Sequence, residues 1–162
     1  MSLSGRVAAI TGASAGIGLA CTQHLAREGV AVVLGARRVS LLDATAKQIV
    51  AGGGRAAIVQ IDVTREEDVQ ALVATATRDF GRLDVMICNA GFGYYAPIDQ
   101  MPSDVMRRMM DVNYMGTFYG ARARPHRSFR PAIRTRSRRD DDAGRRPVGC
   151  LNPTSPFQAA RS

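Results

Sequence analysis

Three glycines near the start of the chain have the spacing of a phosphate-binding turn. Gly12, Gly16 and Gly18 follow an apolar run at residues 7–10, whose lack of polar alternation predicts a strand buried on both faces. Gly12 would permit a tight exit from the strand, Gly16 a close approach of backbone to ligand, and Gly18 a helix packed near the sheet. The helix that begins there would direct its amide groups and positive dipole end at a diphosphate. Taken alone, the glycines also fit a sharp bend without a ligand.

The next candidate binding residues are Arg37 and Arg38, which end a second apolar run over residues 30–36. In dinucleotide-binding folds, an acidic side chain about 20 residues beyond the glycines binds the ribose hydroxyls. This sequence has no acidic residue at that point. An arginine there would suit a ribose 2′-phosphate instead, because a guanidinium can form paired hydrogen bonds with phosphate oxygens. The pair therefore predicts NADP in preference to NAD. The alternative is that both arginines only solvate a loop.

The string Thr-Gly-Ala-Ser-Ala-Gly-Ile-Gly at residues 11–18 resembles the cofactor-binding motif of the short-chain dehydrogenase/reductase family. An Asn-Ala-Gly tripeptide after a fourth apolar run and the stretch at residues 111–120 are also similar to that family, so the resemblance covers roughly residues 4–120. It implies hydride transfer between a nicotinamide and a small alcohol or carbonyl substrate. The cofactor residues expected from the motifs are Gly12, Ser14, Gly16, Ile17, Gly18, Arg37, Arg38, Asp62, Val63, Asn89, Ala90 and Gly91.

The resemblance also implies individual roles. Asp62 would contact the amino group of adenine, and the backbone of Val63 would help to place the ring. Asn89 would steady the central sheet, while Asn113 would hold a water that relays protons to a catalytic lysine. Without the resemblance, Asp62 reads as a strand-end cap, and Asn113 as a helix-interior asparagine bonded to its own backbone.

The family's catalytic serine and its Tyr-x-x-x-Lys pair have no assignable positions. A nearby lysine is needed because a phenol titrating near pH 10 is a poor base at neutral pH unless a cation stabilises its phenolate. The only lysine is Lys47, in a predicted helix, and no tyrosine precedes a lysine by four residues. We therefore expect an NADP-preferring oxidoreductase by ancestry with little or no turnover. A non-enzymatic dinucleotide-binding fragment or regulatory protein is the alternative.

Alternating strands and helices are expected to position these residues. Strands are predicted over residues 7–10, 30–36, 56–61 and 83–88, and helices over 17–28, 39–51, 64–80 and 103–110. The order predicts an α/β fold with a doubly wound, Rossmann-like parallel sheet that is incomplete, with the ligand at the carboxyl ends of its strands. The fourth strand is expected to form an exposed edge.

Two local features can be predicted in more detail. Thr64 and Glu67 have the spacing of a capping box at the start of the third helix. The inward face of the first helix is predicted to carry Leu19, Ala20, Leu25 and Ala26.

The net charge of +8 is confined to the end of the chain. Residues 1–121 hold 11 basic and 11 acidic side chains, whereas residues 122–162 hold 11 arginines and 3 aspartates. This break separates a predicted dinucleotide-binding domain (1–121) from an irregular Arg/Pro-rich tail (122–162), expected to be disordered or the product of a shifted reading frame.

The tail lacks interleaved aromatics, so nucleic-acid binding is the less favoured interpretation. No metal is expected at residues 140–142, because three adjacent aspartates cannot converge on one ion.

Cys21, Cys88 and Cys150 are far apart and lack metal-ligand spacing, which is typical of thiols in a reducing, cytoplasmic compartment. No apolar run reaches the roughly 18 residues of a membrane helix, and the first five residues do not resemble a signal peptide. Complete members of the family form homo-oligomers, but the oligomeric state of this chain and its substrate stay open.

Overall fold

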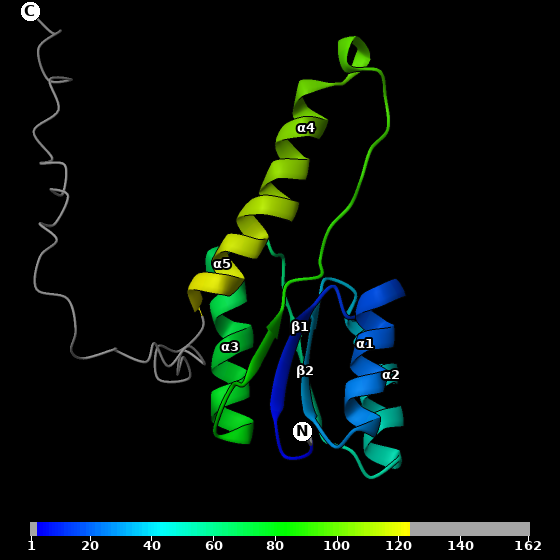
Figure 1. The fold of residues 1–162 in the computed structure, drawn as a ribbon, viewed down its shortest axis with the longest axis vertical. Coiled ribbons are helices and arrows are strands. Elements are labelled where there is room, and N and C mark those ends of the chain that lie inside the picture. Colours follow the sequence, from blue (N-terminus) through cyan, green and yellow to red (C-terminus); the bar gives the residue numbers. More distant parts are fainter. Residues whose placement is uncertain (1–2, 124–162) are drawn as a thin grey trace, which may run out of the picture. The chain divides into compact units, whose positions relative to one another are not determined.

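A computed structural model describes residues 3–123 of the chain, in which strands and helices alternate (Figure 1). Their order is β1 (Val7–Thr11), α1 (Gly16–Arg27), β2 (Ala31–Ala36), α2 (Val39–Ala51), β3 (Ala56–Gln60), α3 (Glu66–Phe80), β4 (Val85–Ile87), a 3₁₀ turn (Ile98–Gln100), α4 (Ser103–Met109), a π-helical segment (Met110–Met115) and α5 (Gly116–Ala123). Helix α5 thus continues two residues past the predicted boundary at residue 121. The predictions for the rest of the tail, including residues 140–142 and the shifted frame, lie outside the described residues.

The four strands form one parallel sheet in the order β3-β2-β1-β4. In the centre, Ala9 of β1 is opposite Val33 of β2 on one side and Met86 of β4 on the other. The chain leaves β1 at the middle, winds outward to β2 and β3, and returns to the opposite side at β4. The predicted doubly wound, Rossmann-like arrangement is therefore confirmed.

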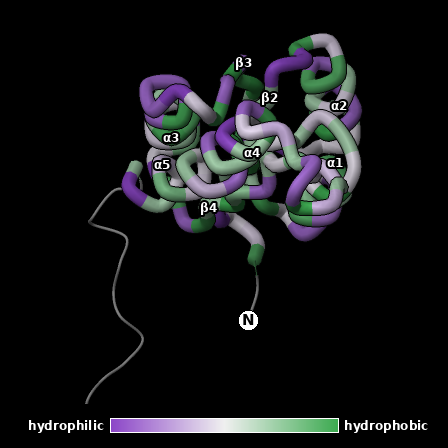
Figure 2. The backbone as a smooth tube through the Cα atoms, turned by 90° about the horizontal axis from the view of Figure 1, so that it is seen from above, coloured by the Kyte–Doolittle hydropathy of each residue, from purple (hydrophilic) through white to green (hydrophobic). Residues whose placement is uncertain are grey.

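Helices cover both faces of the sheet. Seen from above, α1 and α2 lie on one side of the strands, and α3 and α5 lie on the other (Figure 2). One apolar cluster joins Val7 of β1 to Leu72 of α3, and a second joins the alternate residue Ile10 to Leu42 of α2. Every residue of β1 and β2 is buried, because both faces are covered, which accounts for their uninterrupted apolar sequences.

The inward face of α1 differs from the prediction at one position. Leu25 packs against the core as expected and Leu19 is half-buried, but Ala20 is exposed. The fully buried positions are Gly18 and Thr22, one turn apart, with the Thr22 hydroxyl donating to the Gly18 carbonyl (2.8 Å). The helix turns this small-residue side to the sheet because a glycine permits closer backbone contact than a leucine does.

The predicted capping box at α3 is wrong. The helix begins after Arg65, whose guanidinium binds the Glu67 carboxylate (2.6 Å), so Glu67 does not reach back to a capping amide. The Thr64 hydroxyl donates to the Asp62 carboxylate (2.8 Å) instead of accepting from the helix. The Asp62 carboxylate, two residues upstream, accepts hydrogen bonds from both the amide and the hydroxyl of Thr64.

The described part of the sheet ends at β4, which pairs with β1 alone, as predicted for an edge. Val85 of this strand keeps 39% of its surface exposed. A row of exposed apolar side chains also runs along α4, the π-helical segment and α5, four residues apart, at Met106, Met110, Tyr114 and Phe118. No helix in the described part of the chain is both long and apolar enough to cross a membrane.

Asp84, just before β4, ties this edge strand to β1. Its side chain is only 10% exposed and accepts hydrogen bonds from the Val7 amide (2.9 Å) and from the guanidiniums of Arg6 (3.0 Å) and Arg82 (2.5 Å). Burial on its own would raise the pKa of this carboxyl. The hydrogen bonds from Val7, Arg82 and Arg6 outweigh that effect and leave the pKa below its ordinary value.

Asp84→Asn is therefore expected to lower the free energy of unfolding by about 1.5–3 kcal/mol at pH 7, the usual range for hydrogen bonds to a charged group. A lowered pKa stabilises the fold above the unfolded-state pKa of about 3.9, and that contribution is lost as the pH falls through the folded-state pKa. Urea unfolding at pH 7 and pH 3 should show the difference from wild type shrinking at the lower pH. Asp43→Asn, which breaks an exposed ion pair with Lys47, serves as the control and should change little.

Candidate functional site

The turn between β1 and α1 is built around the three predicted glycines. Gly12 has φ +69°, and a Cβ on it would lie 2.9 Å from the Cα of Ala90. A Cβ on Gly18 would overlap the Gly12 carbonyl oxygen, so α1 can start this close to the strand only with glycine there. Gly16 has φ +58°, and a Cβ built on it would meet nothing within 4 Å, so its backbone faces open space. Helix α1 thus begins at the strand's carboxyl end, as predicted.

The first turn of α1 has no side-chain cap. Its N-cap residue, Ala15, has extended backbone and supplies no hydrogen-bond acceptor from its side chain. The amide groups at the start of a helix carry a positive partial charge and need an acceptor. An anion above this turn would supply one.

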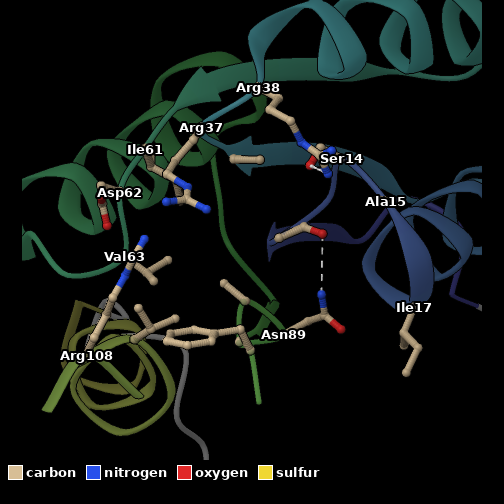
Figure 3. A pocket seen from close by; sticks show the side chains of 16 residues that line it. Ser14, Ala15, Ile17, Arg37, Arg38, Ile61, Asp62, Val63, Asn89 and Arg108 are labelled. Carbon is tan, nitrogen blue, oxygen red and sulfur yellow. Dashed lines mark hydrogen bonds between the residues drawn. The ribbon is translucent and has the colours of Figure 1, made fainter. Parts of the chain in front are cut away.

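A cleft of about 580 Å³ opens at the carboxyl ends of the strands (Figure 3). All of the predicted cofactor residues line it except Gly16 and Gly18. These two glycines belong to the first turn of α1 but do not line the cleft. The predicted residues that line it are Gly12, Ser14, Ile17, Arg37, Arg38, Asp62, Val63, Asn89, Ala90 and Gly91. Segments from four separate strand ends therefore meet at one opening.

Asn89 fastens the end of β4 to the end of β1. Its side-chain amide donates to the carbonyls of Thr11 (3.2 Å) and Gly12 (3.4 Å), and its backbone amide donates to the Thr11 hydroxyl (3.0 Å). The Ala90 amide donates to the same hydroxyl (3.0 Å). These four hydrogen bonds hold the Asn-Ala-Gly backbone against the glycine turn, so the expected steadying of the central sheet is confirmed.

Two guanidiniums stand at the end of β2. Arg38 donates to the Ser14 hydroxyl (3.1 Å), which ties the arginine to the glycine turn. Figure 3 shows the Arg37 side chain on the same wall of the cleft, directed toward the opening between Asp62 and Ser14. The two arginines make this end of the cleft electropositive.

Asp62 is the only carboxylate among the lining residues. A hydrogen bond from the Thr64 amide (3.0 Å) is the main reason that its pKa lies below the ordinary value; burial opposes this, and the Thr64 hydroxyl and the charges of Arg37 and Arg108 assist it. The carboxyl is therefore ionised at neutral pH. It remains a hydrogen-bond acceptor at the mouth of the cleft.

Asn113 lies in the π-helical segment and clasps the loop after the Asn-Ala-Gly tripeptide. Its Oδ1 accepts from the Phe92 amide (3.0 Å) and its Nδ2 donates to the Phe92 carbonyl (2.9 Å). The alternative that its side chain bonds its own helix backbone is wrong, because Phe92 takes both groups. A Cβ on Gly91 would lie 3.0 Å from the Asn113 Oδ1, so the tripeptide's glycine permits this approach.

Six lining residues are not among the cofactor residues predicted from the sequence: Ala15, Ala36, Ile61, Phe92, Arg108 and Val112. The first three neighbour predicted residues in the chain and could have been included on that ground. Phe92 follows the Asn-Ala-Gly tripeptide directly. Arg108 and Val112 come from the helix beyond the loop, and no local pattern marks them, because only the chain's return over the sheet brings them to the cleft.

The family model for short chain dehydrogenases matches residues 6–126, three quarters of the chain. The chain belongs to this family. It is 42% identical over 123 residues to glucose 1-dehydrogenase 2 of Bacillus subtilis, a match that covers 75% of this chain and 48% of the relative. The chain therefore spans about half the length of the relatives that it matches.

Solved structures of the family have the same arrangement. A short-chain type dehydrogenase/reductase from Mycobacterium marinum superposes with a TM-score of 0.71 at 35% identity, covering 75% of this chain and 49% of the other. An alcohol dehydrogenase from the archaeon Thermococcus sibiricus, complexed with 5-hydroxy-NADP, gives 0.70 at 35% identity, with 73% and 51% covered.

The Tyr-Lys pair that family catalysis requires is absent from this cleft. Within residues 3–123, Lys47 lies in α2, where it pairs with Asp43 (2.6 Å), and the four tyrosines are not among the residues that line the opening. The described site thus contains the residues predicted to bind a cofactor, without the acid–base pair.

Asn113→Ala removes both bonds to Phe92. The Phe92 amide should then exchange its hydrogen about five- to tenfold faster, as expected for the loss of about 1–1.4 kcal/mol of local protection. Amide hydrogen exchange followed by NMR or mass spectrometry measures this. Asp111→Ala, on the same π-helical segment, is the control; equal exchange rates in both variants would contradict the clasp.

Proposed function

We propose that this chain binds NADP through the cleft at the carboxyl ends of its strands and descends from an oxidoreductase of the short-chain type. One observation carries the proposal: residues at the uncapped start of α1, the backbone of Gly12 and two guanidiniums line the same opening. These are the partners that a diphosphate and a ribose 2′-phosphate require.

The residues present fit this cofactor in charge and in space. The open side of Gly16 leaves room for a phosphate above the first turn of α1. Arg37 and Arg38 would bind the 2′-phosphate, Asp62 the adenine amino group, and the backbone at Val63 would place the ring. The backbone of the Asn-Ala-Gly tripeptide would line the nicotinamide side. A bound nicotinamide supplies or accepts the hydride.

The chemical half of the site is proposed to be inactive in this chain. The family's substrates are small alcohols or carbonyls, and proton exchange with them needs a phenol whose pKa is lowered by a close cation. Asn113 occupies the family's proton-relay position, but in the described residues its side chain holds Phe92 and has no catalytic lysine to serve. The scattered free thiols of Cys21 and Cys88 support a reducing compartment, the cytoplasm, as its location.

A non-enzymatic dinucleotide-binding protein is the second candidate function. The same cleft favours it, because every contact described above serves binding and none serves proton transfer. Nucleic-acid binding through the Arg-rich tail rests on residues outside the described part and is the weaker alternative.

Arg37→Asp tests the cofactor preference. Exchanging a guanidinium for a carboxylate should raise the Kd for NADPH about 10- to 100-fold, since a charge-assisted contact is replaced by repulsion. Affinity for NADH should hold or improve, because a carboxylate accepts hydrogen bonds from ribose hydroxyls. Fluorescence titration of the 162-residue chain gives both constants. Arg107→Asp, an equal charge change outside the cleft lining, is the control; unchanged discrimination in Arg37→Asp would refute the assignment.

Steady-state oxidation of NADPH with a panel of small aldehydes and ketones tests the proposed inactivity. We expect no rate above that of the buffer, because no phenol–ammonium pair is available to protonate the alkoxide. A complete short chain dehydrogenase in the same assay serves as the positive control. Saturable turnover by this chain would show that another group takes over proton transfer.

A further inference from the structure

A third guanidinium, that of Arg108, reaches the cleft from the wall opposite β2. Arg108 belongs to α4, and Figure 3 shows its side chain rising from that helix toward Val63 and Asp62. In the described residues no carboxylate lies within 4 Å of its guanidinium, so it is not neutralised by an ion pair within the protein. Its charge is available to a ligand.

An aromatic ring supports this side chain through a cation–π contact. The Arg108 Cζ lies 5.6 Å from the centre of the Phe92 ring, within the range of a cation–π contact. The backbone of Phe92 is fixed in turn by the two hydrogen bonds of Asn113, at 2.9 and 3.0 Å. A planar guanidinium held against a ring loses less conformational freedom on binding an anion than an unsupported one.

Arg108 and Arg37 act on the same end of the cleft. Both side chains line the cleft and are directed toward the region of Asp62 (Figure 3), and after the dominant hydrogen bond from Thr64 both charges help to lower the pKa of this carboxyl. The uncapped start of α1 is lined by other residues, Ser14, Ala15 and Ile17. The positive charge that α4 contributes is therefore near Arg37, at the end proposed for the adenosine.

The charge balance of the lining favours a ligand with an additional anionic group at that end. Three guanidiniums, from Arg37, Arg38 and Arg108, face one carboxylate, from Asp62. Arg38 already donates a hydrogen bond to Ser14 (3.1 Å). The guanidiniums of Arg37 and Arg108, on opposite walls, are the two that remain for a ligand. A phosphate monoester has enough acceptor oxygens for both.

We propose that Arg108 is a second specificity residue for the ribose 2′-phosphate, completing from α4 a clamp whose other half is Arg37. This rests on the proposed NADP binding. The clamp joins the first strand–helix units to the helix after β4, so cofactor choice depends on a residue about 70 positions beyond the arginine pair at the end of β2.

The test compares two probes that differ only by the 2′-phosphate, adenosine 2′,5′-bisphosphate and adenosine 5′-monophosphate. Isothermal titration of the 162-residue chain gives both dissociation constants without any need for turnover. Arg108→Gln should weaken bisphosphate binding about tenfold, the equivalent of about 1.4 kcal/mol, and change monophosphate binding less than about twofold. Arg108→Lys should recover part of the loss, because it restores the charge but not the fork.

Arg107→Gln is the matched control, since this neighbour is an exposed arginine on the same helix outside the cleft lining. Both probes should bind it as they bind wild type. Equal losses in the Arg107 and Arg108 variants would show a general effect of charge, and equal losses for the two probes would assign Arg108 to another part of the nucleotide; each result overturns the proposal. Urea midpoints matching wild type exclude unfolding as the cause, as expected for an exposed residue.

The wild-type chain separates this proposal from the proposed function. If wild type prefers the bisphosphate and Arg108→Gln keeps that preference, only the role of Arg108 is overturned. If wild type binds the two probes equally or binds neither, the proposed NADP specificity fails, and the clamp fails with it.

Discussion

The close contact between the β1–α1 turn and the end of β4 is the constraint on which the site depends. Two carbonyls of the turn accept hydrogen bonds from the Asn89 side chain, and a Cβ at Gly12 or Gly18 would collide with the same region. At this contact β1 and β4 end side by side, and α1 begins. Because these backbones are held together without bulky side chains, their polar groups and glycine faces form the floor of the cleft.

Further hydrogen bonds connect the floor of the cleft to the segments that form its walls. The Arg38–Ser14 hydrogen bond ties the end of β2 to the turn, and the Asn113–Phe92 pair ties the helix after β4 to the Asn-Ala-Gly loop. Gly116 also packs closely against Val63, because a Cβ on this glycine would lie only 3.0 Å from the valine side chain. The arginines that line the cleft thus belong to segments whose ends are held by hydrogen bonds. This limits the reorganisation that ligand binding requires.

Much of this arrangement could be predicted from the sequence, because it is local. Glycine spacing, a strand without polar alternation and the Asn-Ala-Gly tripeptide each determine a few neighbouring residues, and the parallel order then brings their ends together. The inferences that failed depended on competition between neighbours. Thr64 has the right spacing for a cap, but Asp62 takes its hydroxyl; Ala20 fits the apolar period of α1, but the close approach at Gly18 sets the rotation of the helix. Arg108 could not be predicted, since only the folding of the chain back over the sheet brings α4 to the cleft.

The proposed cofactor binding and the family's proton-transfer chemistry depend on different parts of this architecture. The residues proposed to bind the phosphates and riboses lie at the ends of β1 to β4 and in the helix that follows. By contrast, the acid–base pair of the family has no counterpart among residues 3–123, where the sheet ends at β4 and the row from Met106 to Phe118 is exposed. The proposed recognition of the nucleotide therefore depends on residues at the carboxyl ends of the four strands, whereas the proposed lack of turnover depends on the missing phenol–ammonium pair. A cofactor-binding unit of this kind can lose its chemistry and keep its ligand, because the two properties depend on different contacts.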